Sequence, residues 1–298
     1  MNEIKSSVIG SYPVKINNLK LINNYFKGIE SDWDEYIFMA VNDMINSGIN
    51  YISDGQVRDS FINLILRKIK GCRIRDRPEI VDKIECLQPI ILEDIIKVKS
   101  YLPTNKKLIG VIAGPYTLSE SVVNYYYKDK IDLAYDFANI IKNEIKLIQH
   151  YVDIISIDEP FFSNNFPDYA PELIKIITKN INRNIRLHVC GDVSNIIPEL
   201  IEMPVDILSL EFKAKPDLIK KFNEYENKKK ICLGSVRSDN LKIESVEEIT
   251  SHINNAYSVF GDKIIQISPD CGQRLLQRNI AYNKLINLAK AGEKINEQ

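Results

Sequence analysis

The sequence lacks an excess of charge of either sign. Its 39 lysine and arginine residues nearly balance 40 aspartate and glutamate residues, which leaves a formal net charge of −1 at pH 7. A balanced chain has no long-range field that would attract a polyanion or an anionic lipid surface. We therefore expect neither nucleic acid nor a membrane as a partner, and we expect a small molecule or another protein instead.

Long apolar runs are also missing. No window approaches the about 18 apolar residues of a membrane span, and the start, MNEIKSSVIGSYPVK, has no basic region followed by a long apolar core. Linkers rich in Gly and Ser, or in Pro, are absent as well. The sequence predicts a cytoplasmic protein with a single domain over residues 1–298.

Cysteine and histidine are scarce, with five and three residues respectively. The cysteine number is odd and the spacings are wide, which argues against a disulfide framework: Cys72, Cys86, Cys190, Cys232 and Cys271. We expect free thiols that are buried or metal-bound. Two of these scarce residues nevertheless stand close together, because the stretch RLHVCGDV carries His188 and Cys190 directly after an apolar run.

Short β-branched or apolar runs recur along the chain and alternate with segments of helical periodicity. We expect eight strands, at 7–10, 50–54, 108–113, 152–158, 185–190, 205–211, 230–235 and 263–270. Amphipathic helices are expected at 34–47, 131–149, 170–181, 215–225, 245–259 and 277–291. Near-continuous apolar strands that alternate with helices are typical of a parallel sheet buried on both faces. Eight such units predict an α/β fold, a single (β/α)8 TIM barrel.

The stretch 59–107 is longer than one barrel unit requires. It predicts an excursion after the second strand, beside the mouth of the barrel. The sequence does not define the structure of this excursion.

Chemically capable residues gather where the predicted strands end. They are Ser11, Asp54, Gln56, Asp158, Glu159, His188, Cys190, Glu211, Asp270 and Cys271. In barrel enzymes the active site is built at the carboxyl ends of the strands, so these side chains should surround one mouth.

Residues two apart on a strand face the same side, so His188 and Cys190 can aim at one point. Glu211 ends the next predicted strand and Cys271 follows the last one, and all four are residue types that zinc accepts. The alternative is a core histidine beside a cysteine that packs as a small hydrophobe. We interpret Cys72, Cys86 and Cys232 as packing residues, and His150 and His252 as solvated or capping.

The strand ends together resemble the catalytic C-terminal barrel of the cobalamin-independent methionine synthase family. The segments that carry the resemblance run the length of the chain: VIGSYP, DGQVRDSFI, AGPYTL, SIDEP, LHVCGD, LSLEF, GSVRSDNLKIESVEEI and SPDCGQRLL. The chain is similar to the short form of the enzyme, which lacks the additional N-terminal barrel. The resemblance implies a methyltransferase that forms methionine from homocysteine.

The resemblance also implies a site. Zinc would be held by His188, Cys190, Glu211 and Cys271. Homocysteine would be held through its carboxylate and backbone near Ile9, Gly10 and Ser11, and through its ammonium by Asp158 with help from Gln56. Taken alone, VIGSYP is also typical of an ordinary turn, and SIDEP of a helix N-cap in which Asp158 and Glu159 face backbone amides.

The reaction needs zinc because only a thiolate attacks a methyl group readily, and the free thiol of homocysteine is mostly protonated at neutral pH. Coordination to zinc removes the thiol proton. We assign catalytic roles to Asp158, which orients the substrate, and to Glu211, which is the ligand that yields or lengthens as the substrate sulfur arrives.

Three positions depart from the long enzymes. Gln56 stands where they have a glutamate, Ser121 where they have a tryptophan at the folate site, and Asp239 where they have a histidine linked to protonation of the departing pterin. Loss of the stacking ring and of the proton donor disfavours methyltetrahydrofolate. We expect a methylcobamide donor, free or presented by a corrinoid protein.

Three rival functions remain open. A related zinc-dependent alkyl transferase would use another thiol, such as coenzyme M, and would not need Asp158 for an ammonium group. A uroporphyrinogen decarboxylase-like barrel would need an arginine-rich mouth, for which Arg58, Arg73, Arg75 and Arg77 are available. A non-catalytic binding protein would have a structural zinc site closed to substrate.

Overall fold

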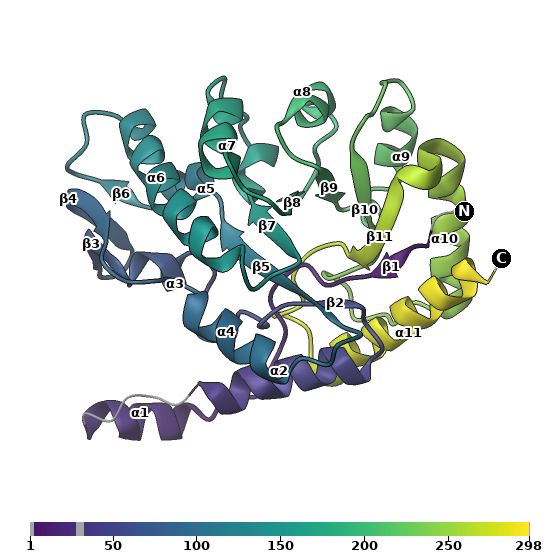
Figure 1. Ribbon diagram of the computed structural model, residues 1–298, viewed down its shortest axis with the longest axis horizontal. Helices are drawn as coiled ribbons and strands as arrows, with labels where there is room; N and C mark the ends of the chain where they lie inside the picture. The colour runs from purple at the N-terminus through teal and green to yellow at the C-terminus, as the bar shows by residue number, and fades with distance from the viewer. Residues whose placement is uncertain (1–2, 28–32, 298) are drawn as a thin grey trace.

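The centre of the molecule is a sheet of parallel strands that curls into a barrel (Figure 1). The computed structural model describes residues 3–27 and 33–297. The eight strands of this sheet are β1 (Lys5–Ser6), β2 (Tyr51–Ile52), β5 (Lys107–Ala113), β7 (Ile154–Asp158), β8 (Asn184–Val189), β9 (Ile207–Leu210), β10 (Lys230–Val236) and β11 (Ile264–Pro269). Their order is β1-β11-β10-β9-β8-β7-β5-β2, and a bridge between Ser7 and Tyr51 closes the ring.

The helices lie around the outside of the barrel, as the α/β pattern requires, except that the first one extends away from it (Figure 1). They are α1 (Asn18–Phe26), α2 (Asp34–Asn46), α3 (Asn63–Leu66), α4 (Leu92–Tyr101), α5 (Pro115–Glu120), α6 (Lys130–Ile148), α7 (Ala170–Thr178), α8 (Ile197–Glu202), α9 (Asp217–Phe222), α10 (Val246–Phe260) and α11 (Arg278–Asn296). Short 3-10 turns lie at η1 (Pro160–Ser163) and η2 (Gly261–Lys263). Within the described ranges, none of these helices combines the length and apolarity needed to cross a bilayer.

The predicted (β/α)8 barrel is confirmed, but the first two strands are shorter than expected. The strand predicted at 7–10 lies at Lys5–Ser6, and the one predicted at 50–54 spans only Tyr51–Ile52. Single backbone bonds continue beyond these strands, since the amides of Val8 and Tyr12 donate to the carbonyl oxygens of Tyr51 at 3.1 Å and Gly55 at 2.9 Å. The Ser53 hydroxyl adds a bond to the Gly10 carbonyl oxygen at 2.8 Å. A pattern of apolar residues does not reveal where regular pairing ends.

Some helices begin or end at other residues than predicted, in two cases because a single residue limits the helix. The helix predicted at 170–181 stops at Thr178, and Asn180 adopts a left-handed φ of 64° that no helix can continue. The helix predicted at 215–225 covers only Asp217–Phe222, since Pro216 is its N-cap, and the last helix continues past 291 to Asn296.

The excursion after the second strand is an antiparallel hairpin flanked by two helices. Strands β3 (Ile69–Ile74) and β4 (Pro78–Cys86) pair with each other, and β6 (Val123–Asn124) adds to β4 in parallel. Figure 1 shows this small sheet beside the barrel, next to α3. The expectation of an excursion is met, and its strand content is what the sequence left undefined.

The interior of the barrel holds an arginine rather than only branched apolar side chains. Arg186 of β8 is fully buried. Its Nε donates to Ser156 Oγ at 3.1 Å and its Nη1 to Ser7 Oγ at 3.0 Å. Its Nη2 donates to the carbonyl oxygens of Val8 and Ile9, each at 3.1 Å. The guanidinium therefore ties the segment after β1 to β7 and β8.

We predict that Arg186→Met lowers the free energy of unfolding by at least about 2 kcal/mol, because each buried acceptor left unpaired costs about 1–3 kcal/mol. The matched control is Arg77→Met, at an exposed position of the excursion. Urea unfolding followed by circular dichroism measures both. Equal unfolding midpoints for the two variants would contradict a role for Arg186 in holding the barrel.

Candidate active site

A cavity of about 300 Å³ opens among the carboxyl ends of the barrel strands. Residues that the sequence assigned to substrate line it, namely Ile9, Gly10, Ser11, Gln56 and Asp158. Three of the four expected zinc ligands line it too, namely His188, Cys190 and Cys271. The fourth, Glu211, is not part of the lining.

An imidazole and two thiols meet in this cavity. His188 belongs to β8, Cys190 follows that strand directly, and Cys271 follows β11. The His188 Nε2 lies 3.0 Å from Cys190 Sγ, and the two sulfur atoms are 2.8 Å apart. All three donor atoms lie within 4.8 Å of one another. The i and i+2 spacing on β8 aims both side chains at the mouth, and the curl of the barrel brings in the third.

The second ring nitrogen of His188 turns away from the sulfur atoms. Its Nδ1 lies 3.2 Å from both the carbonyl oxygen and Oγ of Ser209 on the neighbouring strand β9. Such a contact fixes the ring orientation and leaves Nε2 for a ligand. The imidazole is therefore held in place by the sheet itself.

The two thiols are in hydrogen-bonding contact, and their pKa values shift in opposite directions. The hydrogen bond from Cys190 lowers the pKa of Cys271 well below its usual range, and His188 acts in the same direction although burial opposes it. The same hydrogen bond, together with burial, raises the pKa of Cys190. Burial lowers the pKa of His188, but the neighbouring Cys271 outweighs it and the net shift is upward. The arrangement therefore favours the thiolate form at Cys271 over Cys190.

Glu211 lies beside this cluster without joining it. Its carboxylate accepts a hydrogen bond from the amide of Gly191, and its charge interacts with Cys271 and His188. Burial is the first cause that raises the pKa of Glu211, and the charge of Cys271 adds to it. The carboxylate is half-buried and electrostatically coupled to both residues.

Asp158 ends β7 and turns its carboxylate into the cavity. Its Oδ1 accepts a hydrogen bond from Ser156 Oγ at 3.0 Å. Burial raises the pKa of Asp158 to about 6, while the nearby His188 and Arg186 lower it. A buried acid in this state favours a cationic partner that would compensate its ionised form.

Glu159 has a different task from its neighbour. Its carboxylate accepts hydrogen bonds from the amides of Tyr116 at 3.0 Å and Thr117 at 2.7 Å, at the start of α5. Gly114 leaves room for it, since a Cβ there would lie 2.1 Å from Glu159 Oε1. The capping interpretation of SIDEP thus describes Glu159, which caps α5 rather than the turn that follows it, and does not describe Asp158.

Sequence reasoning missed the outer wall of the cavity, which Ser60, Phe61, Pro160, Arg274 and Leu275 contribute. The Arg274 guanidinium donates to the carbonyl oxygens of Gln56 and Asp59, so it joins the loop after β11 to the loop after β2. Gln56 itself has a φ of 46°, which turns the chain sharply there. All five wall residues lie within the motifs DGQVRDSFI, SIDEP and SPDCGQRLL, but no role was assigned to them there.

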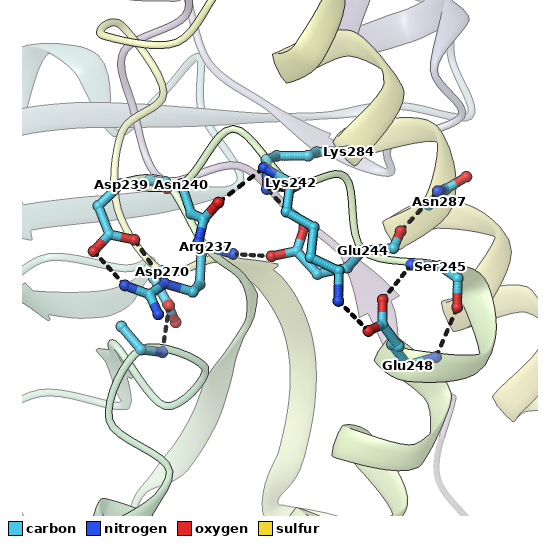
Figure 2. A network of polar contacts seen from close by, with 12 residues as sticks. Arg237, Asp239, Asn240, Lys242, Glu244, Ser245, Glu248, Asp270, Lys284 and Asn287 are labelled. Carbon is cyan, nitrogen blue, oxygen red and sulfur yellow. Dashed lines mark hydrogen bonds and ion pairs between the residues drawn. The ribbon is translucent and has the colours of Figure 1, made fainter.

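Of the three residues that depart from the long enzymes, Gln56 lines the cavity, whereas Ser121 and Asp239 do not. The Ser121 hydroxyl donates to the Thr117 carbonyl oxygen at 2.6 Å at the end of α5, and Ser121 does not line the cavity. Asp239 is 62% exposed and forms a bidentate ion pair with Arg237 (Figure 2). The hydrogen bond with that arginine lowers the pKa of Asp239.

The remaining histidines and cysteines are structural. His150 is exposed, as expected, but the expectation of a solvated or capping role for His252 is wrong. Its Nε2 lies 2.9 Å from the Gly234 carbonyl oxygen, and burial lowers its pKa to about 4. Cys232 is buried beside Ser268 in the barrel, while Cys72 and Cys86 are half-buried in the hairpin.

The fold and the site together define a (β/α)8-barrel protein with a thiol and imidazole donor set at the carboxyl end of the barrel. The family model described as "Cobalamin-independent synthase, Catalytic domain" matches residues 4–294. The chain belongs to this family, which confirms the resemblance carried by its motifs.

Relatives and solved structures agree with this family. A protein named methionine synthase from Methanocaldococcus jannaschii is 37% identical over 306 residues, covering 96% of this chain and 97% of its own. One from Saccharolobus solfataricus is 30% identical and covers 99% of this chain and 96% of its own. The structure of a B12-independent methionine synthase from a Shewanella species matches with a TM-score of 0.83 at 20% identity, over 99% of this chain and 98% of that one. That structure supports the fold.

Glu159 should make the free energy of unfolding depend on pH. Burial raises the pKa of Glu159 from 4.5 to about 7, so the folded state favours its protonated form. The part of the stability due to this group is therefore present below pH 4.5 and is lost as the pH rises toward about 7. We predict that Glu159→Gln removes this fall from the pH profile of urea unfolding.

The matched control is Glu93→Gln, at an exposed position of α4. This variant should keep the wild-type pH profile. If Glu159→Gln and wild type fall in parallel from pH 4.5 to 7, the carboxylate is not protonated on folding in this window.

Proposed function

We propose that this protein transfers a methyl group to the thiol of homocysteine and forms methionine, with zinc as its metal. The observation that carries the proposal is the meeting of His188, Cys190 and Cys271 within 4.8 Å in the cavity at the barrel mouth. We propose Glu211, beside this cluster, as the fourth ligand.

The residues fit zinc by their chemistry. One imidazole nitrogen and two thiols are the softer ligands that zinc takes readily, and a carboxylate is a ligand that can leave or lengthen. A cluster that lines an open cavity suits a catalytic metal better than a closed structural one. A zinc ion held there would supply the Lewis acidity that keeps a substrate thiol deprotonated at neutral pH.

The amino-acid part of homocysteine has its own proposed partners. Asp158 offers a carboxylate to the ammonium group, and a bound cation would bring its raised pKa down and keep it ionised. The segment Ile9 to Ser11 lies along the same cavity and would hold the carboxylate end. Gln56 accepts a hydrogen bond there without adding charge, and its Oε1 lies so close to Gly10 that a Cβ at that residue would approach it to 2.6 Å.

For the methyl donor we propose a methylcobamide, free or carried by a corrinoid protein, in preference to methyltetrahydrofolate. The only tryptophan of the chain is Trp33, which packs against Tyr36 and does not line the cavity. The hydrogen bond with Arg237 lowers the pKa of Asp239, which makes this carboxyl a poor acid for protonating a departing pterin. A methylated corrinoid needs no such proton on its leaving group.

Asp158 also favours homocysteine over acceptors without an amino group. A transferase acting on coenzyme M would bury this carboxylate in its cavity with no ammonium group to pair with it, which costs free energy. A decarboxylase of the uroporphyrinogen type would need several arginines at the mouth. Arg73 instead pairs with Glu79 in the hairpin, and Arg58 pairs with Asp94.

We predict that Cys271→Ser loses zinc and methionine formation together. A serine hydroxyl replaces a thiolate ligand poorly, so activity should fall by more than about 100-fold. The measurements are metal content by mass spectrometry and methionine formation from homocysteine. Cys72→Ser, in the hairpin, is the control and should keep both. A Cys271→Ser protein with full zinc and full activity would refute the assignment of this ligand.

The donor is tested by comparing methylcobalamin with methyltetrahydrofolate at equal concentration on zinc-loaded protein. We expect methionine from methylcobalamin and none above background from the folate. Methionine from methyltetrahydrofolate alone would overturn the donor assignment and leave the acceptor assignment in place. Replacing homocysteine with coenzyme M in the same assay should give no methylated product.

A further inference from the structure

Cys271 is the one member of the thiol cluster that does not adjoin its strand. His188 lies in β8 and Cys190 follows it directly, whereas Cys271 comes two residues after β11 ends at Pro269. Its backbone amide and carbonyl are therefore outside the sheet ladder. Something other than strand pairing must fix this residue if its sulfur is to stay with the other two.

A single side chain occupies both backbone groups of Cys271. The hydroxyl of Ser238 donates to the Cys271 carbonyl oxygen at 2.7 Å. The Cys271 amide donates to the same Ser238 oxygen at 3.1 Å. One hydroxyl thus uses its hydrogen and a lone pair on the same residue. The contact begins where the β10 and β11 ladder stops, since the Asp270 amide makes the last backbone bond there, to Val236 at 2.8 Å.

The loop that carries Ser238 is itself firmly held. Figure 2 shows Glu244 between the backbone of Arg237 and the side chain of Lys284 from α11. Lys284 is fully buried, and its Nζ lies 2.7 Å from Glu244 Oε2 while also donating to the Lys242 carbonyl oxygen. Asn287 donates to the Glu244 carbonyl oxygen at 2.7 Å. The loop can therefore act as a rigid support for Ser238.

The residues around Cys271 are anchored separately, so the role of Ser238 is local. Asp270 accepts hydrogen bonds from the amides of Lys213 and Ala214, and the Gln273 amide donates to the Ser11 carbonyl oxygen at 2.8 Å. Removing one hydroxyl should leave these anchors intact. It should free the backbone of Cys271 alone.

We propose that Ser238 is a positioning residue that fixes the backbone of Cys271 and thereby sets how tightly the cluster retains its metal. The proposal rests on the zinc site of the proposed function. Side chains that orient metal ligands without touching the metal change metal affinity by about 10–100-fold when they are removed. Ser238 has the contacts of such a residue.

The test is the zinc affinity of the full chain, measured by competition with a chromophoric chelator. Ser238→Ala should weaken zinc binding by about 10-fold or more. Ser238→Thr keeps the hydroxyl and should restore most of the affinity. The matched control is Ser235→Ala, which removes a buried hydroxyl from β10 that donates only to the Leu233 carbonyl oxygen at 3.0 Å. This control should bind zinc as wild type does.

The outcomes separate the two proposals. Unchanged affinity in Ser238→Ala, or an equal loss in Ser235→Ala, overturns the role of Ser238. Tight zinc binding by wild type without methionine formation overturns the proposed function and leaves the role of Ser238 intact, provided that Ser238→Ala still loses zinc. A wild-type chain that binds no zinc overturns both.

Discussion

The buried guanidinium of Arg186 is the constraint on which the rest of the site depends. Strands β1 and β2 are the shortest of the barrel, with two residues each, and they meet through one bridge with a backbone bond on either side of it. Arg186 reaches across the interior to the segment after β1 and bonds two of its carbonyl oxygens. Through Ser156 the same side chain is connected to Asp158, so it also supports the floor of the cavity.

Buried carboxylates likewise fix the loops, because they accept hydrogen bonds from backbone amides. Glu144 accepts hydrogen bonds from backbone amides at the start of α4, and Glu159 accepts them from amides at the start of α5. Asp270 accepts them from the amides of Lys213 and Ala214, which follow β9. Each fixes backbone groups that regular structure leaves unpaired. The acidic residues near the mouth therefore divide into those that hold the scaffold and those that face the cavity, and Asp158 and Glu159 show that adjacent residues can differ in this respect.

The sequence predicted the barrel because its strands are apolar on both faces and its helices have a clear period. It also indicated His188 and Cys190, whose spacing on one strand decides where they point. It could not predict the outer wall of the cavity or the contacts of Ser238, because these depend on loops whose course follows from tertiary packing. The first strand was misplaced for a related reason, since the segment after it makes only single backbone bonds and its Val8 and Ile9 carbonyl oxygens accept from Arg186.

Cys271 is the last of the three donor residues to be synthesised, so the donor set is complete only at the end of the chain. Cys190 and His188 leave the ribosome well before the last strand, but a domain generally folds as a unit. The third donor arrives only with β11, whose pairing with β1 joins the two ends of the barrel. A shortened or half-folded chain therefore has an incomplete donor set, and the three donors can meet only on a finished barrel.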